Sequence, residues 1–556
     1  MATDQLLDPI TIEVQWNRLI SIMEEVDATV VRTSFSTIVG ESRDFGVIIL
    51  DRHGRSLAQS QLSSPAFVSH LPITTKHLLG VFPADALAQG DVLITNDPWI
   101  GTGHLPDLSI ITPVIFEGQV VGFIACAAHV ADIGGRLDYF GARDVFEEGL
   151  RIPPSRLIVG GTENEDLFRW IAANVRVPDA VLGDIHAVVA AERIGVERVK
   201  EFLMDCGGAA AFQALADEIL NRSEQAMRQA LRGLPNGEWQ CDMNADGFRR
   251  LLHIHVKIVK QDDRIDIDFG GSSPQFDDAS INSVINCTLA DSFYPFKCSL
   301  TPGLPNNEGL YRPLNVVAPQ GSVLNTTFPS AVNARSKASC HCHTAIYGAM
   351  AEVMPEKIQA GSGDFWVVDL YGTRPDGDRF RVLVLIHGGK GATAQMDGLP
   401  AITFPYNGSV TPVEIIENQA PVVVEYKRLV QDSGGAGQFR GGLGQEFKLR
   451  ARATLTASVF TDKVTIPPPG VLGGRPGLPG RFVVNGEDGP AEPRTLVAGD
   501  WICLRLPGGG GCGDPRKRVL RAVVRDVADG YVSPETAGNE YGVDCLSQPN
   551  HTALSK

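Results

Sequence analysis

The first stretch with a clear hydrophobic period lies close to the N-terminus of the chain. Asp8 and Pro9 form a typical helix start, in which an aspartate caps the helix and proline takes its first position. Apolar residues then recur at intervals of three and four, which is the spacing of one helix face. These residues are Leu19, Met23, Val26 and Val30. The pattern predicts an amphipathic helix over residues 9–35.

Two later stretches have the same helical period. Residues 184–232 are rich in alanine and carry apolar residues at helical spacing, so this central segment is predicted to be helical. Near the C-terminus, RKRVLRAVVRDVADG (residues 516–530) places Val519, Val523 and Val527 on one face. This segment predicts a closing helix.

Short apolar runs between these helices are rich in Val and Ile and end in Gly, Pro or Asp, which is typical of strands. The clearest runs are FGVIIL (45–50), DVLIT (91–95), SIITPVIF (109–116) and VVGFIACAAH (120–129). Residues 250–269 alternate apolar and polar positions on both sides of a QDD turn, which predicts a hairpin. After residue 310, strands with Gly and Pro turns are predicted to dominate.

Together these elements predict an α+β chain of several domains. An α/β N-terminal region is followed by a central helical segment and by a β-rich, Gly-rich C-terminal half. We expect an N-terminal domain over residues 1–235, a central mixed domain over 236–415 and a β-rich C-terminal domain with its terminal helix over 416–556.

Composition and charge narrow the possible functions. The 556 residues are 43% hydrophobic and carry a formal net charge of −16, and such an acidic chain is a poor candidate for binding nucleic acid or an anionic membrane. No run of about 18 apolar residues predicts a membrane span, and the N-terminus lacks the pattern of a secretory signal. The ten cysteines are scattered, which favours reduced thiols in a cytoplasmic protein.

Two His-x-x-Asp pairs, His104/Asp107 and His129/Asp132, flank two of the predicted strands. The strands 109–116 and 120–129 are separated by only three residues, so they are expected to pair as a hairpin with both His-x-x-Asp pairs at one end. Imidazole and carboxylate together suit Zn²⁺, Mn²⁺ or Fe²⁺. The alternative is that each histidine simply bonds its neighbouring aspartate in a turn or cap. Asp44, at the start of a strand, is either a further ligand or an exposed turn residue.

Other candidate motifs are weaker. SCHCH (339–343) looks like a metal site, but neighbours in a strand point to opposite faces, so at most two of its side chains could share an ion. The segment 506–515, LPGGGGCGDP, is either an anion cradle or a closely packed turn, and its Cys512 is a possible nucleophile. Residues 388–398 lack the order of a phosphate loop, so the chain is expected to carry no ATP site of its own.

Several long motifs resemble the hydantoinase B family. They include NDPWIGTGHLPD, HVADIGG, PNNEGLYRPLNVVAPQGSVLN, DSGGAGQFRGGLG and LPGGGGCGDP, and they run in the family's order from residue 8 to about residue 542. The family includes subunits of ATP-dependent N-methylhydantoinase, 5-oxoprolinase, caprolactamase and the acetone and acetophenone carboxylases. The resemblance implies a hetero-oligomer with a hydantoinase A-type subunit, which would bind ATP and Mg²⁺.

The resemblance also implies a divalent metal, Zn or Mn, on this chain. Its ligands would be His104, Asp107, His129 and Asp132, with Asp44 as a further candidate and with His129 and Asp132 in catalytic roles. In this interpretation the chain is the metal subunit of a cyclic-amide hydrolase. The partner would phosphorylate the carbonyl of a hydantoin, 5-oxoproline or lactam, and a metal-bound hydroxide would attack it.

Three other interpretations stay open at this stage. One is a self-sufficient metallohydrolase, which would be active without a partner or ATP. The same chain could belong to an ATP-dependent ketone carboxylase of the acetone or acetophenone type. It could also be a non-catalytic scaffold that holds the partner ATPase.

Overall fold

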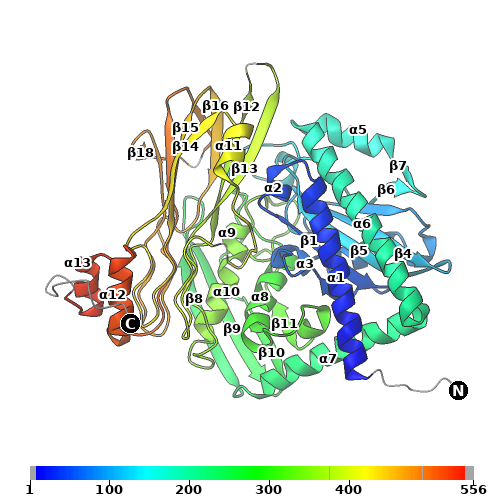
Figure 1. Ribbon diagram of the computed structural model, residues 1–556, viewed down its shortest axis with the longest axis horizontal. Coiled ribbons are helices and arrows are strands. Elements are labelled where there is room, and N and C mark those ends of the chain that lie inside the picture. The colour runs from blue at the N-terminus through cyan, green and yellow to red at the C-terminus, as the bar shows by residue number, and fades with distance from the viewer. Residues whose placement is uncertain (1–7, 375, 403, 491, 545–556) are drawn as a thin grey trace, which may run out of the picture.

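The computed structural model describes residues 8–374, 376–402, 404–490 and 492–544 (Figure 1). Within these residues the chain forms four β-sheets with helices packed against them, which confirms the predicted α+β fold of several domains. The helices are α1 (Pro9–Thr33), α2 (Thr37–Gly40), α3 (Pro65–Val68), α4 (Leu71–Val81), α5 (Glu165–Asn174), α6 (Pro178–Cys206), α7 (Gly208–Arg232), α8 (Ile285–Leu300), α9 (Ser336–Ser339), α10 (His341–Ala349), α11 (Val413–Gln419), α12 (Leu520–Ala528) and α13 (Pro534–Thr536).

The N-terminal part is built on a seven-stranded antiparallel sheet. In sheet order its strands are β2 (Ser56–Gln59), β1 (Phe45–Asp51), β5 (Gln119–His129), β4 (Asp107–Phe116), β3 (Val92–Thr95), β6 (Ser155–Val159) and β7 (Thr162–Glu163). The predicted hairpin of residues 109–129 is confirmed as β4 and β5, which pair directly. These two strands lie in the middle of the sheet and position the site described below.

Both faces of this sheet are covered, which explains the uninterrupted apolar runs of its strands. Val47 and Ile49 of β1 pack into the core beneath α1 and α6, whereas Ile48 and Leu50 face α4 on the other side. The helices α1 and α6 lie side by side across one face (Figure 1).

The predicted N-terminal and central helices are confirmed. The predicted helix over 9–35 is α1, and the Asp8 carboxylate accepts hydrogen bonds from the amides of Ile10 and Thr11 as an N-cap. The predicted helical segment 184–232 forms α6 and α7. These two helices meet at Gly207, whose φ of 99° is a conformation that glycine adopts at little cost.

A four-stranded sheet forms the middle of the molecule. Its order is β11 (Leu314–Val317), β10 (Arg264–Asp268), β9 (Leu252–Gln261) and β8 (Gly237–Ala245), and the predicted hairpin of residues 250–269 is confirmed as β9 and β10. The helix α10 packs against β8 and β9.

The expectation of a strand at SCHCH was wrong. Cys340 precedes α10 and the next three residues form its first turn, where Cys342 packs into the core that α10 shares with β8 and β9. Because nearly every residue of α10 is buried, the helix has no amphipathic period, and the sequence pattern could not distinguish it from a buried strand.

The C-terminal half contains two antiparallel sheets. One has the order β13 (Arg379–His387), β12 (Phe365–Thr373), β16 (Leu455–Phe460) and β19 (Arg494–Leu496). The other has the order β14 (Val422–Leu429), β15 (Gln445–Ala451), β20 (Trp501–Arg505), β17 (Arg481–Val484) and β18 (Glu487–Asp488). The two sheets share one core, so they form a sandwich.

The strand β13 connects this sandwich to the N-terminal part. Val382 and Val384 face the sandwich core, whereas the alternating residues Leu383 and Leu385 pack into the core of the N-terminal sheet. The domain boundary expected at residue 415 falls between β13 and β16 of one sheet, and the division into three domains stays a prediction.

The glycine clusters form a layer between the sandwich and α12 (Figure 1). We call it the glycine layer, and it consists of residues 388–398, 434–444, 470–480 and 507–513. Its backbones lie so close together that a Cβ on Gly441 would stand 1.9 Å from the carbonyl oxygen of Gly509. The amides of residues 509–512 each donate to a backbone carbonyl of another segment. Close packing, and not an anion cradle, therefore accounts for 506–515.

The closing helix is confirmed as α12, although it is shorter than the predicted segment 516–530. Val523 is fully buried, whereas Val519 precedes the helix and is 70% exposed, so it does not share the buried face as expected. Among the described residues, every helix is too short or too polar to cross a bilayer.

Candidate metal centre

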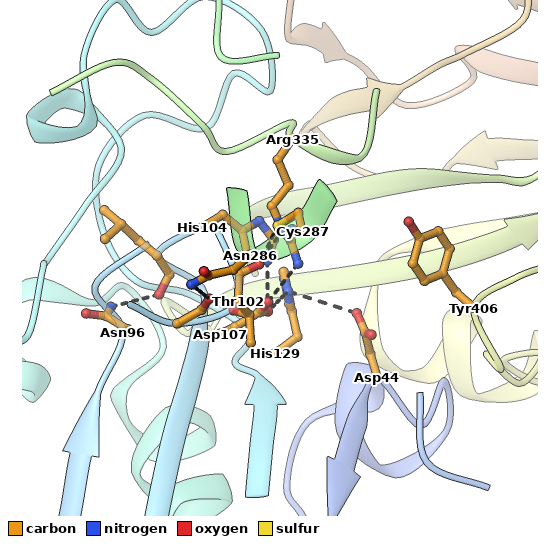
Figure 2. Close-up of polar contacts among 12 residues, drawn as sticks. Asp44, Asn96, Thr102, His104, Asp107, His129, Asn286, Cys287, Arg335 and Tyr406 are labelled. Carbon is orange, nitrogen blue, oxygen red and sulfur yellow. Dashed lines mark hydrogen bonds and ion pairs between the residues drawn. The ribbon is translucent and has the colours of Figure 1, made fainter. Parts of the chain in front are cut away.

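Three of the predicted ligands meet at the open end of the β4–β5 hairpin. Asp107 and His129 face each other in the strand register, and His104 lies just before β4. The Oδ1 atom of Asp107 is 2.8 Å from Nε2 of His104 and 2.9 Å from Nδ1 of His129. Donor atoms of the three side chains lie within 4.8 Å of one another, close enough to hold one ion (Figure 2).

The hydrogen on Nδ1 of His104 determines that Nε2 is the ring nitrogen with a free lone pair. Nδ1 of His104 lies 2.9 Å from the carbonyl oxygen of Asn333, which only accepts hydrogen bonds, so this nitrogen carries the hydrogen. Burial and the nearby Arg335 lower the pKa of His104 to about 4, so its ring is neutral near pH 7. Nε2 then presents a lone pair toward Asp107, and it has no hydrogen-bond partner.

Two acceptor atoms that face each other at 2.8 Å repel one another unless both bind the same cation. A histidine that donates its other N–H to a backbone carbonyl is the usual arrangement of a metal ligand, because the bond orients the ring. The residues therefore fit a divalent metal.

Asp107 is held in its charged form. Burial alone would raise its pKa, but electrostatic contacts, among them the ion pair with Arg335, outweigh burial and hold the pKa of this carboxyl well below its ordinary value. Arg335, which directly precedes α9, places Nη2 3.0 Å from Oδ2 of Asp107, and its Nε donates to the carbonyl of Thr102. Oδ1 thus remains directed at the two histidines.

Asp44 lies at the edge of the cluster, on the side that faces Tyr406 (Figure 2). Its Oδ2 atom is 4.0 Å from Nδ1 of His129, and its backbone carbonyl accepts a hydrogen bond from the amide of His129. Burial is the main reason that the pKa of Asp44 is raised to about 6, and His129 partly opposes it. Asp44 is close enough to serve the same ion, directly or through a water.

The structure does not bring Asp132 to this cluster. Its Oδ1 accepts hydrogen bonds from Nη1 of Arg176 at 2.8 Å and from Nη1 of Arg381 at 2.7 Å. Its Oδ2 is bonded by the amide of Arg176. Both oxygens are engaged by cationic or amide donors, so the carboxylate is committed to a buried ion pair.

We call His104, Asp107 and His129 together the metal cluster. An enclosed pocket opens beside it, between the N-terminal sheet and the sandwich. We call it the metal pocket; its volume is about 100 Å³, several times the 10–15 Å³ that one water needs. Polar residues along its wall include Asp44, His70, His104, His129, Asp291, Arg335 and Tyr406. Apolar and aromatic side chains, such as Phe365 and Leu385, form the rest of the wall.

Four residues of this pocket were missed in the sequence. His70 is fully buried, its pKa is lowered to about 3 mainly by burial, and neither ring nitrogen has a hydrogen-bond partner. Tyr406 donates to Asp291, whose pKa is raised to about 6 mainly by burial. One signal was present in the chain, because the tripeptide His-Leu-Pro occurs at residues 70–72 as well as at 104–106. Arg335 and the Asp291–Tyr406 pair carried no local signal.

The cysteine motifs do not form a second centre. His341 lies 3.4 Å from Asp462, whereas Cys340 contacts the hydroxyl of Tyr406 at 3.0 Å, so neighbours in SCHCH point to different partners. Burial raises the pKa of Cys512 to about 11, which disfavours the thiolate that a nucleophile needs. The cysteines that the structure describes are free thiols.

A buried His–Asp–His cluster at the end of a hairpin, beside an enclosed pocket, is the arrangement of a candidate metal enzyme. The sequence matches the model of the family Hydantoinase B/oxoprolinase over residues 8–515, and the chain belongs to this family. The resemblance noted in the sequence is thereby confirmed.

Individual relatives agree with this assignment. The B-type component of a putative D-/L-hydantoinase from Pseudomonas sp. (strain NS671) is 30% identical over 565 residues, which cover 97% of this chain and 95% of that protein. The crystal structure of ATP-dependent caprolactamase from Pseudomonas jessenii is similar with a TM-score of 0.90, at 29% identity and over 99% of both chains. A nucleotide-free acetone carboxylase shares the fold, with a TM-score of 0.88 at 20% identity over 96% of this chain and 80% of that chain.

Proposed function

We propose that this chain is the metal-bearing subunit of a two-component, ATP-dependent hydrolase of cyclic amides such as hydantoins, 5-oxoproline or lactams. The observation that carries the proposal is the lone pair of His104 Nε2, buried and directed at the carboxylate of Asp107. Relatives that are a hydantoinase component of the B type and an ATP-dependent caprolactamase support the reaction class.

His104, Asp107 and His129 would hold the divalent metal, Zn or Mn, with Asp44 as the fourth protein ligand or as a partner of a bound water. When bound, such a metal acts as a Lewis acid that lowers the pKa of water toward neutrality and polarises a carbonyl. Arg335 keeps Asp107 ionised and oriented. Asp132 is left out of the proposed ligand set because its oxygens already bond Arg176 and Arg381.

Asp44 is the best placed proton acceptor for the attacking water. Its carboxylate lies 4.0 Å from His129 and lines the pocket, whereas Asp132, which the resemblance implied to be catalytic, does not line it. Because its pKa is about 6, Asp44 is mostly ionised near pH 7 and can still take up a proton. His129 would then position the water and not act as the base.

The far wall of the metal pocket favours an amide over a ketone. Tyr406 donates its hydroxyl hydrogen to Asp291 at 3.2 Å, and the Asp291 carboxylate keeps acceptor capacity for a second donor. A hydantoin, 5-oxoproline or lactam has a ring nitrogen that can share a proton with this carboxylate, and a simple ketone has no such nitrogen. The apolar remainder of the wall suits the carbon skeleton of the ring and excludes water from the activated carbonyl.

Activation would take place in the partner. An unstrained amide is a weak electrophile, and transfer of a phosphoryl group to its carbonyl oxygen supplies a good leaving group. We propose that a hydantoinase A-type subunit carries ATP and Mg²⁺ for this step, because the segment 388–398 lacks the phosphate-loop pattern. We place the complex in the cytoplasm, where the free thiols stay reduced.

A second candidate is a subunit of an ATP-dependent ketone carboxylase, which the fold shared with acetone carboxylase supports. A screen of the complex, co-expressed with the A-type subunit, against hydantoins, 5-oxoproline, larger lactams and aryl ketones separates the two. Hydrolysis of a cyclic amide without added bicarbonate is the expected result. Carboxylation of a ketone, with no amide hydrolysed, would overturn the first proposal.

The role of the metal cluster has its own test, the ratio of ADP formed to product formed. We expect a ratio near one in the natural complex and far above one in His129→Ala, because phosphoryl transfer and attack on the carbonyl use different residues. His186→Ala is a matched control, since His186 also pairs with an acid, Glu163 at 3.1 Å, but is about half exposed and far from the pocket. If both quantities fell together in His129→Ala, the metal would be needed for activation as well. If both stayed at natural levels, the chain would be a scaffold.

A further inference from the structure

A second cavity lies between the loop that joins β8 to β9 and the sandwich, and cationic side chains line it. We call it the basic groove; Arg249, Arg250, Lys337, Arg481 and Arg505 line it, and its volume is about 780 Å³. This concentration of positive charge stands out in a chain whose formal net charge is −16. A groove of this size lies within the range of about 300–1,000 Å³ that is usual for small-molecule sites.

The acidic residues of the groove are already engaged. Asp246 accepts hydrogen bonds from the amides of Val464, Thr465 and Ile466, so it serves the adjacent loop. Asp488 pairs with Arg481 at 3.1 Å. A third carboxylate, Asp462, pairs with Lys337 at 3.0 Å, and none of the three neutralises Arg249 or Arg250.

Arg249 and Arg250 present the free charges. Their guanidinium groups lie over the rings of Phe248 and Phe276, 4.7 and 4.1 Å from the ring centroids, and form no ion pair with a described residue. Arg249 has a φ of 59°, a left-handed conformation that is uncommon for a residue with a Cβ. The Nε atom of Arg505 is buried and has no hydrogen-bond partner. It lies 3.7 Å from a carboxylate oxygen of Glu446.

The floor between these charges is apolar. Leu251, Val464 and Leu478 line the groove with partly exposed side chains, and Phe482 lies beneath them. Guanidinium groups match the oxygens of a phosphate in pairs, and an apolar floor holds the carbon part of a ligand. We propose that the basic groove binds a small organic phosphate, an apolar molecule that carries one phosphoryl group.

The groove lies next to the metal pocket. Tyr139 and Phe460 line the metal pocket, whereas Phe140 lines a cavity of about 200 Å³ that shares Arg249 and Lys337 with the groove. The rings of Phe140 and Phe460 stack with their centroids 5.6 Å apart, so a layer of aromatic rings separates the two cavities. A substrate phosphorylated in the partner would bind in the basic groove before it reaches the metal pocket. Only this role of the groove rests on the proposed function.

The test uses phenyl phosphate and inorganic phosphate as probes of the complex with the A-type subunit, without ATP. Isothermal titration calorimetry should show tighter binding of phenyl phosphate than of inorganic phosphate, because only phenyl phosphate covers the apolar floor. The double variant Arg249→Ser, Arg250→Ser should weaken the binding of phenyl phosphate about tenfold or more, since two charge-assisted contacts are lost. Both arginines are exposed and unpaired, so thermal melting should show an unchanged fold.

Two control variants make the result decisive. Arg521→Ser removes an exposed arginine of α12, outside the groove, and should leave the affinity unchanged. His129→Ala should also leave it unchanged, and a loss there would place the binding at the metal cluster and overturn the proposal. The proposal also fails if the double arginine variant binds phenyl phosphate like the natural protein, if both probes bind equally, or if the variant instead loses the partner subunit, which would make the groove a protein contact.

Discussion

Replacing Asp107 with asparagine tests the proposed metal site directly. The carboxylate has two tasks, because Oδ1 faces His104 and His129 whereas Oδ2 pairs with Arg335. Asparagine keeps the shape and one acceptor oxygen, but it removes the charge that a metal ligand and a buried guanidinium both need.

The size of the effect follows from burial. The side chain of Asp107 is 0% exposed and that of Arg335 is 11% exposed, and Asp107 is the carboxylate with which Arg335 forms an ion pair. A buried cation left without its partner costs about 3–5 kcal/mol, and the retained acceptor oxygen keeps the loss near the lower end. We therefore expect Asp107→Asn to reduce the free energy of unfolding by about 3 kcal/mol and to reduce bound metal at least tenfold.

The control is Asp132→Asn, which also removes a fully buried carboxylate from arginine partners. Arg381 keeps its second partner, Asp369, at 2.8 Å, so the expected loss is smaller, about 2 kcal/mol. Elemental analysis should find about one first-row metal per chain in this control and less than a tenth of that in Asp107→Asn. Unfolding is compared after chelation, so that bound metal does not add to the stability of either protein. A full complement of metal in Asp107→Asn, or an equal loss in Asp132→Asn, would refute the proposed site.

Without its partner the chain should bind ATP no more tightly than millimolar, since it lacks a phosphate loop, and micromolar binding by calorimetry would contradict this. We also expect this chain to be an obligate subunit, because a mean hydropathy of −0.00 in so acidic a chain suggests apolar surface that a partner covers. An obligate interface of this kind would bury upwards of about 2,000 Å². Expressed alone it should self-associate in light scattering, and a stable, fully active monomer would count against it. Gly441→Ala should cost about 3 kcal/mol, because the new Cβ would stand 1.9 Å from the Gly509 oxygen. Gly303→Ala, with no atom within 4 Å of its Cβ, should melt like the natural protein, and an equally stable Gly441→Ala would show that the glycine layer can relax.

Local patterns in the sequence were sufficient to predict the secondary structure that positions the site. The short connection between residues 109–116 and 120–129 requires a hairpin, and the hairpin brings Asp107 opposite His129. The capping signal at Asp8 and the apolar period after it likewise located α1 to within two residues of its C-terminal end. These features depend on neighbours in the chain, which is the information that a single sequence carries.

The structure differs from the predictions where contacts between distant segments determine the position of a side chain. Asp132 repeats the spacing of Asp107, but it follows the end of β5, where Gly134 and Gly135 turn the chain with φ of 78° and 65°. Its arginine partners lie 44 and 249 residues away. Arg335 and Tyr406 likewise reach the pocket from segments far along the chain. No local hydrophobic period predicts that these segments lie near it.

The glycine layer also constrains when the protein can fold. Its four segments span residues 388 to 513, and backbone hydrogen bonds link the first of them to the last, as between Gly389 and Pro507 and between Ala392 and Gly510. During synthesis the amides of Gly389 and Ala392 have no partner until more than a hundred further residues have been added to the chain. The N-terminal sheet can close much earlier, because the seven strands that form it end by residue 163. The wall of the metal pocket supplied by β13 therefore settles last, so the pocket is completed only when the chain is nearly finished.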